Sequence, residues 1–444
     1  MTRRPVDTRG GIARDARSAA NALLLAAAVE GTAGVAVYAY APVFMRQGLG
    51  EPRLAVVTFA LALASLATFV MAGRWGRWGD LTGRPGRLVA AGLAGGAAAL
   101  ALLPLVPSSA AFAGLMVATT AFLAAVMPLS VAWLTVRHPD RPGEAAARLY
   151  RARSVGWAAG SFGSGWLAEH GGVAGIQASF LLSAVLALLA AVAVVATVGR
   201  TTAGATMAGG VPRVSEPGGT PHPGGEAQGE RGGFDAESDR AGFPVTVPAP
   251  LPGGASGVPI WRYPAVVAIA AAVLCTAAGN EAFFAVFGAY LTEFLHGSNG
   301  QVGWALGLAS VLGIIIMAPV GRLADRWGPE RVFTAGMAGY VVMYGLIASL
   351  RTPLATVVAF ALPLYPLTAT GATGVISRTI PPARRGEGVG IYEGSAALAA
   401  SLGSVAGGLV ADLAGLPRVP QVSWALAVAG TLVAWRWVLR GAGR

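Results

Sequence analysis

Two glutamates stand inside long apolar stretches of the chain, Glu30 within 19–45 and Glu281 within 263–294. A charged side chain at the centre of a membrane helix costs about 2.5–3.5 kcal/mol, so each acid is by default a functional candidate. A carboxyl group in a low-dielectric cavity can gain and lose a proton near neutral pH and can exchange it for a cationic or hydrogen-bonding ligand. Both acids are therefore predicted to bind protons or substrate. The alternative is a structural acid bonded to a neighbouring helix or to an arginine.

The composition indicates lipid as the solvent around these acids. The 444 residues are 55% hydrophobic and 12% charged, whereas soluble chains carry about 25% charged residues. Every basic residue is an arginine, and the formal net charge is +11. The arginines lie between apolar runs rather than along one face, which argues against a nucleic-acid partner.

Apolar runs of about 20 residues predict membrane helices. They fall into two groups of six, which predicts an all-α integral membrane protein of two six-helix bundles. The predicted spans are 19–45, 54–73, 88–106, 110–135, 152–169 and 174–198, then 263–294, 301–320, 332–350, 354–377, 388–412 and 421–440.

A segment rich in Gly, Pro, Ser and charge separates the two groups, and it is predicted to be a disordered cytoplasmic linker. Arginines crowd the alternate loops assigned to the cytoplasm, and only Arg46, Arg53, Arg351 and Arg418 fall on the other side. Both termini are therefore predicted to be cytoplasmic and the protein to be multi-pass in the cytoplasmic (inner) membrane. The predicted parts are a tail 1–18, a bundle 19–199, the linker 200–260, a bundle 261–440 and a tail 441–444.

A short motif of Gly, Asp and Arg occurs once in each half, after its second span. The chain reads GRWGDLTGR at 76–84 and GRLADRWGPER at 321–331. Glycines allow a tight reversal, and an aspartate can cap a helix or pair with arginine. Both copies are predicted to occupy the cytoplasmic turn before the third span of their half.

This repeated loop in a 6+6 helix chain resembles the signature of the major facilitator superfamily. The second copy is close to the family pattern, and the first departs from it at Trp78, Leu81 and Pro85. The resemblance implies two bundles that rock in alternating access around a midplane substrate site, lined by the first, fourth, seventh and tenth spans. It also implies a cytoplasmic latch, with Asp80 and Asp325 as its central acids. The predicted latch residues are Gly76, Asp80, Gly83, Arg84, Gly321, Asp325, Arg326 and Gly328.

Polar and aromatic residues on the four cavity helices are the next candidates, because aromatic walls with a few hydrogen-bonding groups suit a small organic ligand. Helix packing is the alternative for each. The predicted cavity residues are Tyr38, Tyr40, Thr119, Thr120, Asn280, Tyr290, Tyr365 and Thr368.

Other residues are interpreted structurally. Arg153 and Glu393 lie near the cytoplasmic ends of the fifth and eleventh spans and are interpreted as ion-paired or as reaching the interface. Gly156, Gly160 and Gly403 are expected to let helices approach closely.

We expect a secondary carrier for a small organic molecule, coupled to protons, acting as a monomer, with export slightly favoured over uptake. The fourth span holds no arginine and the fifth no Gly-Pro pair, two patterns that drug–proton antiporters often carry. Uptake of a sugar or other metabolite is the alternative carrier function, and a non-transporting membrane sensor is the alternative class. The four histidines have no metal-ligand spacing, and the chain contains no phosphate-binding loop. No enzymatic activity, metal or cofactor is therefore expected.

Overall fold

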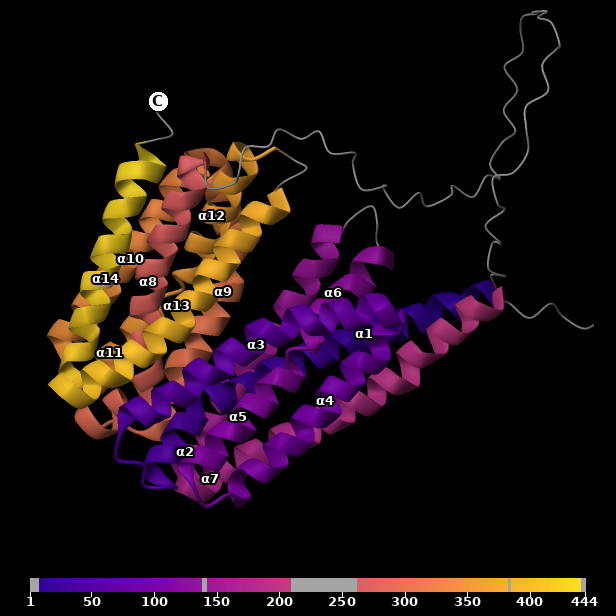
Figure 1. Cartoon of the computed structure of the whole chain (residues 1–444), viewed down its shortest axis with the longest axis horizontal. Helices are drawn as coiled ribbons and strands as arrows, with labels where there is room; N and C mark the ends of the chain where they lie inside the picture. Colours follow the sequence, from indigo (N-terminus) through magenta and orange to yellow (C-terminus); the bar gives the residue numbers. More distant parts are fainter. Residues whose placement is uncertain (1–7, 138–141, 209–261, 382–384, 441–444) are drawn as a thin grey trace, which may run out of the picture.

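The computed structural model describes residues 8–137, 142–208, 262–381 and 385–440, and these ranges fold into helices joined by short turns (Figure 1). Eleven helical segments in them are long and apolar enough to cross a membrane. The longest, Ala146–Val198, has 53 residues, although about 20 suffice to cross a bilayer. Gly172 interrupts it with φ 55° and ψ −131°, so it contains two membrane helices. The predicted all-α architecture of twelve membrane helices is confirmed.

The first six membrane helices form one bundle, drawn from indigo to magenta in Figure 1. Its fifth and sixth helices are the parts of α7 before and after Gly172. In chain order the elements are α1 (Thr8–Val35), η1 (Ala36–Tyr40), α2 (Ala41–Gln47), α3 (Leu54–Thr82), α4 (Pro85–Leu102), η2 (Leu103–Leu105), α5 (Ser109–Leu123), α6 (Val126–Arg137) and α7 (Pro142–Ala208).

The other six membrane helices form the second bundle, drawn from pink to yellow. In chain order its elements are α8 (Pro264–Ala289), η4 (Tyr290–Phe294), α9 (Asn299–Trp327), α10 (Pro329–Leu350), α11 (Pro353–Phe360), α12 (Tyr365–Thr379), α13 (Arg385–Ala414), η6 (Leu416–Arg418), α14 (Val419–Val433) and η7 (Ala434–Leu439).

The two bundles share the same interruptions of regular helix. The first helix of each passes into a π-helical turn, η1 in one bundle and η4 in the other. The fourth helix of each is broken, between α5 and α6 and between α11 and α12. π-Helical turns are uncommon and are frequent at functional sites. The duplication suggested by the repeated motif therefore extends to the backbone.

The repeated motif is mostly helical, which differs from the prediction that it occupies the turn. Helix α3 continues to Thr82 and is capped by Gly83 at φ 62°, and α9 continues to Trp327 before Gly328 at φ 90°. The residues before each glycine can all continue a helix, so the chain turns only where a glycine takes a positive φ.

Some predicted boundaries are displaced. Helix α1 begins at Thr8, inside the predicted tail 1–18, and α7 continues to Ala208, inside the predicted linker 200–260. The rest of the predicted linker and the predicted tail 441–444 lie outside the described residues.

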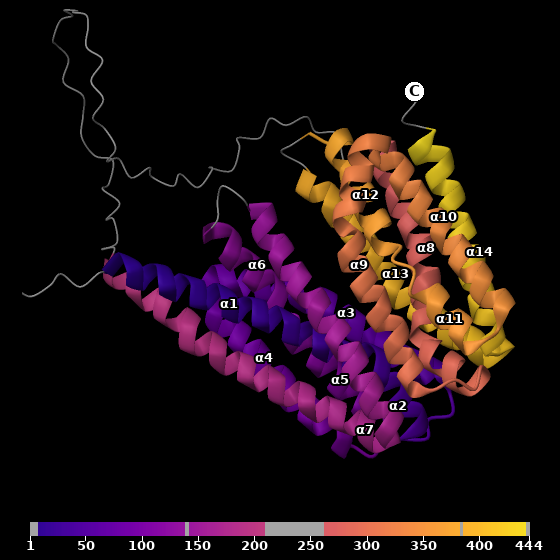
Figure 2. The same ribbon diagram turned by 180° about the vertical axis from the view of Figure 1, so that it is seen from behind.

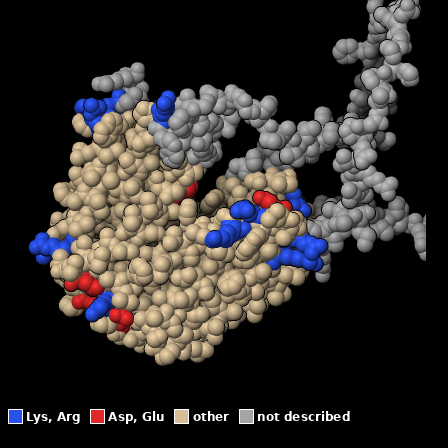
Figure 3. Space-filling model, in the orientation of Figure 1, with Lys and Arg blue, Asp and Glu red and all other residues tan. Residues whose placement is uncertain are grey.

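The two bundles meet at one end and diverge toward the other (Figures 1 and 2). They contact each other where α7 packs on α9 and α3 packs on α13. We call the end that carries α2 and η4 the closed end. We call the end where α1 begins and η7 finishes the open end. Figure 3 shows the surface hollowed between the bundles at the open end, and this hollow is referred to below as the cleft.

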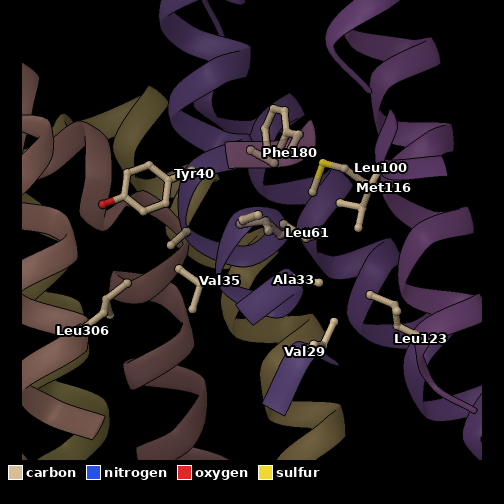
Figure 4. Close-up of a cluster of buried hydrophobic side chains, with 14 of the residues drawn as sticks. Val29, Ala33, Val35, Tyr40, Leu61, Leu100, Met116, Leu123, Phe180 and Leu306 are labelled. Atoms are coloured by element: carbon tan, nitrogen blue, oxygen red, sulfur yellow. The ribbon is translucent and has the colours of Figure 1, made fainter. Parts of the chain in front are cut away.

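The hydrophobic core is continuous across the closed end. Figure 4 shows Val35 and Tyr40 among side chains of their own bundle, with Leu306 of the other bundle nearby. All three belong to one cluster of buried residues. In Figure 3 the charged side chains gather toward the ends of the bundles, while the flanks between them are almost free of charge, as a lipid belt requires.

Close packing inside each bundle depends on glycine. A Cβ at Gly156 of α7 would collide with the carbonyl oxygen of Ala28 in α1, and one at Gly403 of α13 would collide with that of Ala278 in α8. Thr32 reinforces the first contact, because its hydroxyl donates to the Gly156 carbonyl at 2.9 Å. The expectation that these glycines let helices approach closely is confirmed.

Gly156→Ala is expected to destabilise the purified protein by about 1–3 kcal/mol, because overpacking forces α1 and α7 apart. The matched control is Gly163→Ala on the same helix, where an added Cβ meets nothing within 4 Å. Thermal unfolding in detergent should show a lower melting temperature for the first variant and an unchanged or higher one for the second. Equal melting temperatures would contradict the packing argument.

Candidate functional site

The cleft is lined by side chains of both bundles. Tyr365, at the start of α12, is 60% exposed. It nevertheless interacts electrostatically with Arg153 and Tyr150 of the other bundle and with Glu393 of its own. An exposed aromatic flanked by both bundles faces the space between them. Tyr365 is thus a predicted cavity residue that the structure places in the cleft.

Glu30 of α1 forms a two-point ion pair with Arg153 of α7. The Arg153 Nε atom donates to Glu30 Oε2 at 2.5 Å, and Nη2 donates to Oε1 at 3.1 Å. The Glu30 side chain is only 12% exposed and that of Arg153 38%. Such fork-shaped contacts are the strong form of the arginine–carboxylate bond. The pair leaves Nη1 of Arg153 without a bond to Glu30.

The glycines described above position this pair. Gly31 follows Glu30 directly, and a Cβ there would collide with the carbonyl oxygen of Arg153 itself. Only glycine therefore lets the two backbones approach at this level. The sequence predicts that Arg153 forms an ion pair at the cytoplasmic end or reaches the interface, and it does not identify Glu30 as the partner. The close spacing of glycines on both helices was the signal that could have found it.

Tyr38 extends the Glu30 site along the same helix. Its hydroxyl lies 3.0 Å from the Thr68 hydroxyl of α3, and it interacts electrostatically with Glu30 and Arg153. A third helix is thereby joined to the site.

Glu281 of α8 lies beside neutral polar side chains. The Asn280 amide nitrogen lies 3.5 Å from Glu281 Oε1, and the Tyr344 hydroxyl donates to Asn280 Oδ1 at 2.9 Å. Tyr340 interacts electrostatically with Glu281 and with Tyr365. Among the described residues, Glu281 has no ion pair with an arginine, in contrast to Glu30.

The packing contacts show which residues of the two bundles correspond. Ala28 and Thr32 of α1 face glycines of α7, and Ala278 and Ala282 of α8 face glycines of α13. Glu30 lies midway between the first two and Asn280 midway between the second two. Asn280 is therefore the counterpart of Glu30. Glu281, the acid of the second bundle, follows Asn280 in the sequence, so its side chain is rotated by about 100° around the helix axis relative to Asn280.

Four predicted cavity residues are buried within their own bundle in this conformation. Thr119 donates to the Leu115 carbonyl at 2.8 Å, and Thr120 donates to the Ala64 carbonyl of α3 at 3.0 Å. The Thr368 hydroxyl donates to the Tyr365 carbonyl at 3.0 Å, and its side chain is 6% exposed. Helix packing is the role that these contacts support for the three threonines. The fourth, Tyr290, donates to the Ile347 carbonyl at 3.4 Å.

Tyr40 occupies the contact between the bundles at the closed end. It is fully buried, and its hydroxyl donates to the carbonyl of Asn299 in the other bundle at 3.3 Å. Arg46, a few residues further on, forms an ion pair with Glu293 of the other bundle at 2.6 and 2.8 Å.

The predicted latch residues lie at the open end. Asp80 near the end of α3 and Asp325 near the end of α9 are both exposed. Neither forms an ion pair within the described part of the chain. Arg84 and Arg326 are likewise exposed, and Gly83 and Gly328 end the two helices. Gly76 and Gly321 lie within those helices, where an added Cβ would meet nothing within 4 Å.

Comparison with known families agrees with this architecture. The family model described as Major Facilitator Superfamily matches residues 20–251 and 269–443, nearly the whole chain. The chain belongs to the major facilitator superfamily. The resemblance inferred from the repeated motif is thus confirmed, and the protein is a multi-pass membrane transporter of this superfamily.

Solved structures of superfamily transporters share the fold. A bacterial homologue of the iron transporter ferroportin, in an inward-facing state, superposes with a TM-score of 0.68 at 16% identity, over 95% of this chain and 98% of that one. The D-xylose–proton symporter gives 0.67 at 12%, over 95% and 97%. The nucleoside transporter NupG gives 0.66 at 11%, over 94% and 98%. At these identities the likeness concerns the fold alone.

A curated relative is similar over part of the sequence. The tetracenomycin C resistance and export protein of Streptomyces glaucescens is 27% identical over 186 residues, 40% of this chain. The match spans about a third of that relative's length (34%).

Replacing Arg153 is expected to destabilise the protein because Glu30 is then buried without a cationic partner. Arg153→Gln should cost about 1.5 kcal/mol, the lower end for a charged hydrogen bond, because the arginine is partly exposed. The double variant Glu30→Gln/Arg153→Gln should recover part of that loss, as measured by thermal unfolding of the purified proteins. Arg151→Gln, on the exposed side of the same helix, is the control. Strictly additive effects would show that the two side chains are not coupled.

Proposed function

We propose that this member of the superfamily is a proton-coupled exporter of a small hydrophobic or cationic organic molecule, in which Glu281 carries the exchangeable proton. The observation that carries the proposal is the difference between the two membrane acids. Glu30 is neutralised by an arginine at 2.5 Å, whereas within the described residues Glu281 has no ion pair and bonds to the Asn280 amide near tyrosines.

An acid without a cationic partner in this environment has two stable forms. It is neutral when it holds a proton, or it is compensated when a cation lies beside it. Proton and substrate then compete for one carboxylate, which is how an antiporter couples two fluxes. Tyr340, which interacts electrostatically with Glu281, is an aromatic side chain of the type that binds an organic cation.

Glu30 and Arg153 serve in this proposal as the second site of the cleft. Protonation of Glu30 would release Arg153 toward the cleft, and binding of substrate between the bundles would favour or oppose that release. Tyr38, Tyr365 and Asn280 supply hydrogen-bonding groups around the same space. Tyr40 and Tyr290 would become accessible when the closed end opens.

The arginine bias gives the proposal its orientation. With the arginine-rich loops in the cytoplasm, the open end faces inward, and the protein lies in the cytoplasmic membrane with both termini inside. Asp80 and Asp325 are then the acids of a cytoplasmic latch that forms when this end closes. The exposed Arg84 and Arg326 contribute to the same latch.

Export is favoured over uptake by two independent points. The proposed site combines aromatic side chains with one acid, Glu281, that has no ion pair among the described residues, which suits a lipophilic cation more than a sugar. The partial relative from Streptomyces glaucescens is described as an export protein.

Proteoliposomes with a pH dye inside test the coupling. Addition of a lipophilic cation should move protons through the wild type. Glu281→Gln should abolish that flux, because a permanently neutral side chain cannot release a proton. Glu51→Gln, which removes an acid from the closed end, is the control. Flux that survives Glu281→Gln would overturn the assignment of this acid, and flux driven only by sugars or amino acids would overturn the substrate class.

A further inference from the structure

Two carboxylates at the closed end bind backbone amides of the opposite bundle. Glu169 Oε2 accepts from the Gly300 amide of α9 at 2.8 Å. The two oxygens of Asp412 accept from the Leu54 and Ala55 amides of α3, each at 2.9 Å. Both acids therefore bind the first residues of a helix that belongs to the other half of the molecule.

The two contacts are related by the duplication. Glu169 lies three residues before Gly172, and Asp412 lies three residues before Gly415. These glycines have φ 55° and 88° and end the fifth helix of their bundles. Each acid thus lies in the last turn of a fifth helix and binds the start of the second helix of the opposite bundle.

The physical basis is the unsatisfied start of a helix. The first four amides of an α-helix have no partner within it, and the helix dipole adds positive potential there, so a carboxylate is the preferred cap. Helix α3 has no side-chain cap from its own preceding residue, Arg53. In α9, Ser298 accepts from the Gln301 amide at 3.3 Å, and the Gly300 amide is bonded to Glu169. The opposite bundle therefore supplies what each helix lacks.

Small residues bring the helices close enough for these caps. A Cβ at Gly303 of α9 would collide with the Ser161 carbonyl oxygen of α7. A Cβ at Gly408 of α13 would collide with the Thr58 hydroxyl of α3. The same combination of acid and close contact occurs at both places where the bundles meet.

We propose that Glu169 and Asp412 form a duplicated pair of inter-bundle helix caps that hold the closed end shut, and that both must break for this end to open. The Arg46–Glu293 ion pair lies at the same end, but partial exposure of its side chains (21% and 33%) limits its contribution. The caps differ from that pair because three backbone amides lose their partners when the bundles separate. The proposal does not depend on the substrate, the proton or the orientation in the membrane.

Val43 provides a reporter of opening. Its side chain is 3% exposed and lies directly against Gly288 of the other bundle, at the closed end. The chain has a single cysteine, Cys275. A Val43→Cys variant in a Cys275→Ser background therefore reacts with a water-soluble maleimide only when the closed end opens. Nanodiscs expose both faces of the membrane to the reagent.

Glu169→Ala and Asp412→Ala are each expected to raise the labelling rate of this reporter about tenfold, the effect of losing a hydrogen bond to a charged group. Together they should raise it about a hundredfold, because the two sites are separate. Glu169→Gln and Asp412→Asn, which keep one acceptor oxygen, should fall between the wild type and the alanine variants. Glu51→Ala is the matched control and should label close to the wild-type rate, because that side chain accepts from the Arg53 amide of its own bundle and, among the described residues, caps no helix of the other.

Three results would overturn the proposal. Wild-type labelling rates in both alanine variants, with unchanged melting temperatures, would show that the caps do not hold the end shut. An increase in only one of them would show that the pair does not act as a duplicated device. A loss of stability alone would also make an alanine variant label faster. To separate the two effects, each alanine variant is compared with the Val43→Cys protein that lacks the alanine change, each labelled at the same number of degrees below its own melting temperature. Faster labelling that vanishes in this comparison would also count against the caps.

Discussion

This structure depends on one constraint: charged groups inside the membrane have no water to solvate them. In the hydrocarbon region each polar group needs a partner inside the protein, and each charge needs a compensating charge or a proton. The chain meets this demand differently at three levels. Glu30 has an arginine within hydrogen-bonding distance, Glu281 has neutral neighbours, and the acids of the closed end have helix amides. In the proposed function a proton changes the first two arrangements, and a movement of the bundles breaks the third.

Glycine is what makes these short polar contacts attainable. Where α1 meets α7 and where α8 meets α13, the backbones approach so closely that a single added carbon would collide with a carbonyl oxygen. The same holds where the two bundles meet. Packing of small residues supplies association between membrane helices where no hydrophobic force distinguishes protein from lipid. Because the helices lie this close, their side chains can form polar contacts that a wider separation of the helix axes would prevent.

Duplication explains the architecture but not the chemistry. The π-helical turns, the broken fourth helices and the helix caps occur in both bundles. The acids in the membrane do not follow this symmetry, because Asn280 occupies the position equivalent to Glu30 and the acid stands one residue later. Within the part of the chain that the structure describes, one bundle therefore carries a neutral ion pair and the other an acid without an ion pair. Two bundles of similar backbone structure therefore differ in the charged groups that they place in the membrane.

The sequence by itself determined the solvent, the twelve helices, the two bundles and the superfamily, because hydrophobic length and a repeated loop motif are local properties of the chain. It also located Glu30 and Glu281 inside membrane helices, since a charge in an apolar run is visible without a structure. It did not identify Arg153 as the partner of Glu30, or Glu169 and Asp412 as caps of the opposite bundle. Nor did it separate Tyr365, which faces the cleft, from Thr119 and Thr120, which are packed. Those distinctions depend on the rotation of each helix about its axis and on contacts between residues more than a hundred positions apart. Only the packed tertiary structure decides them.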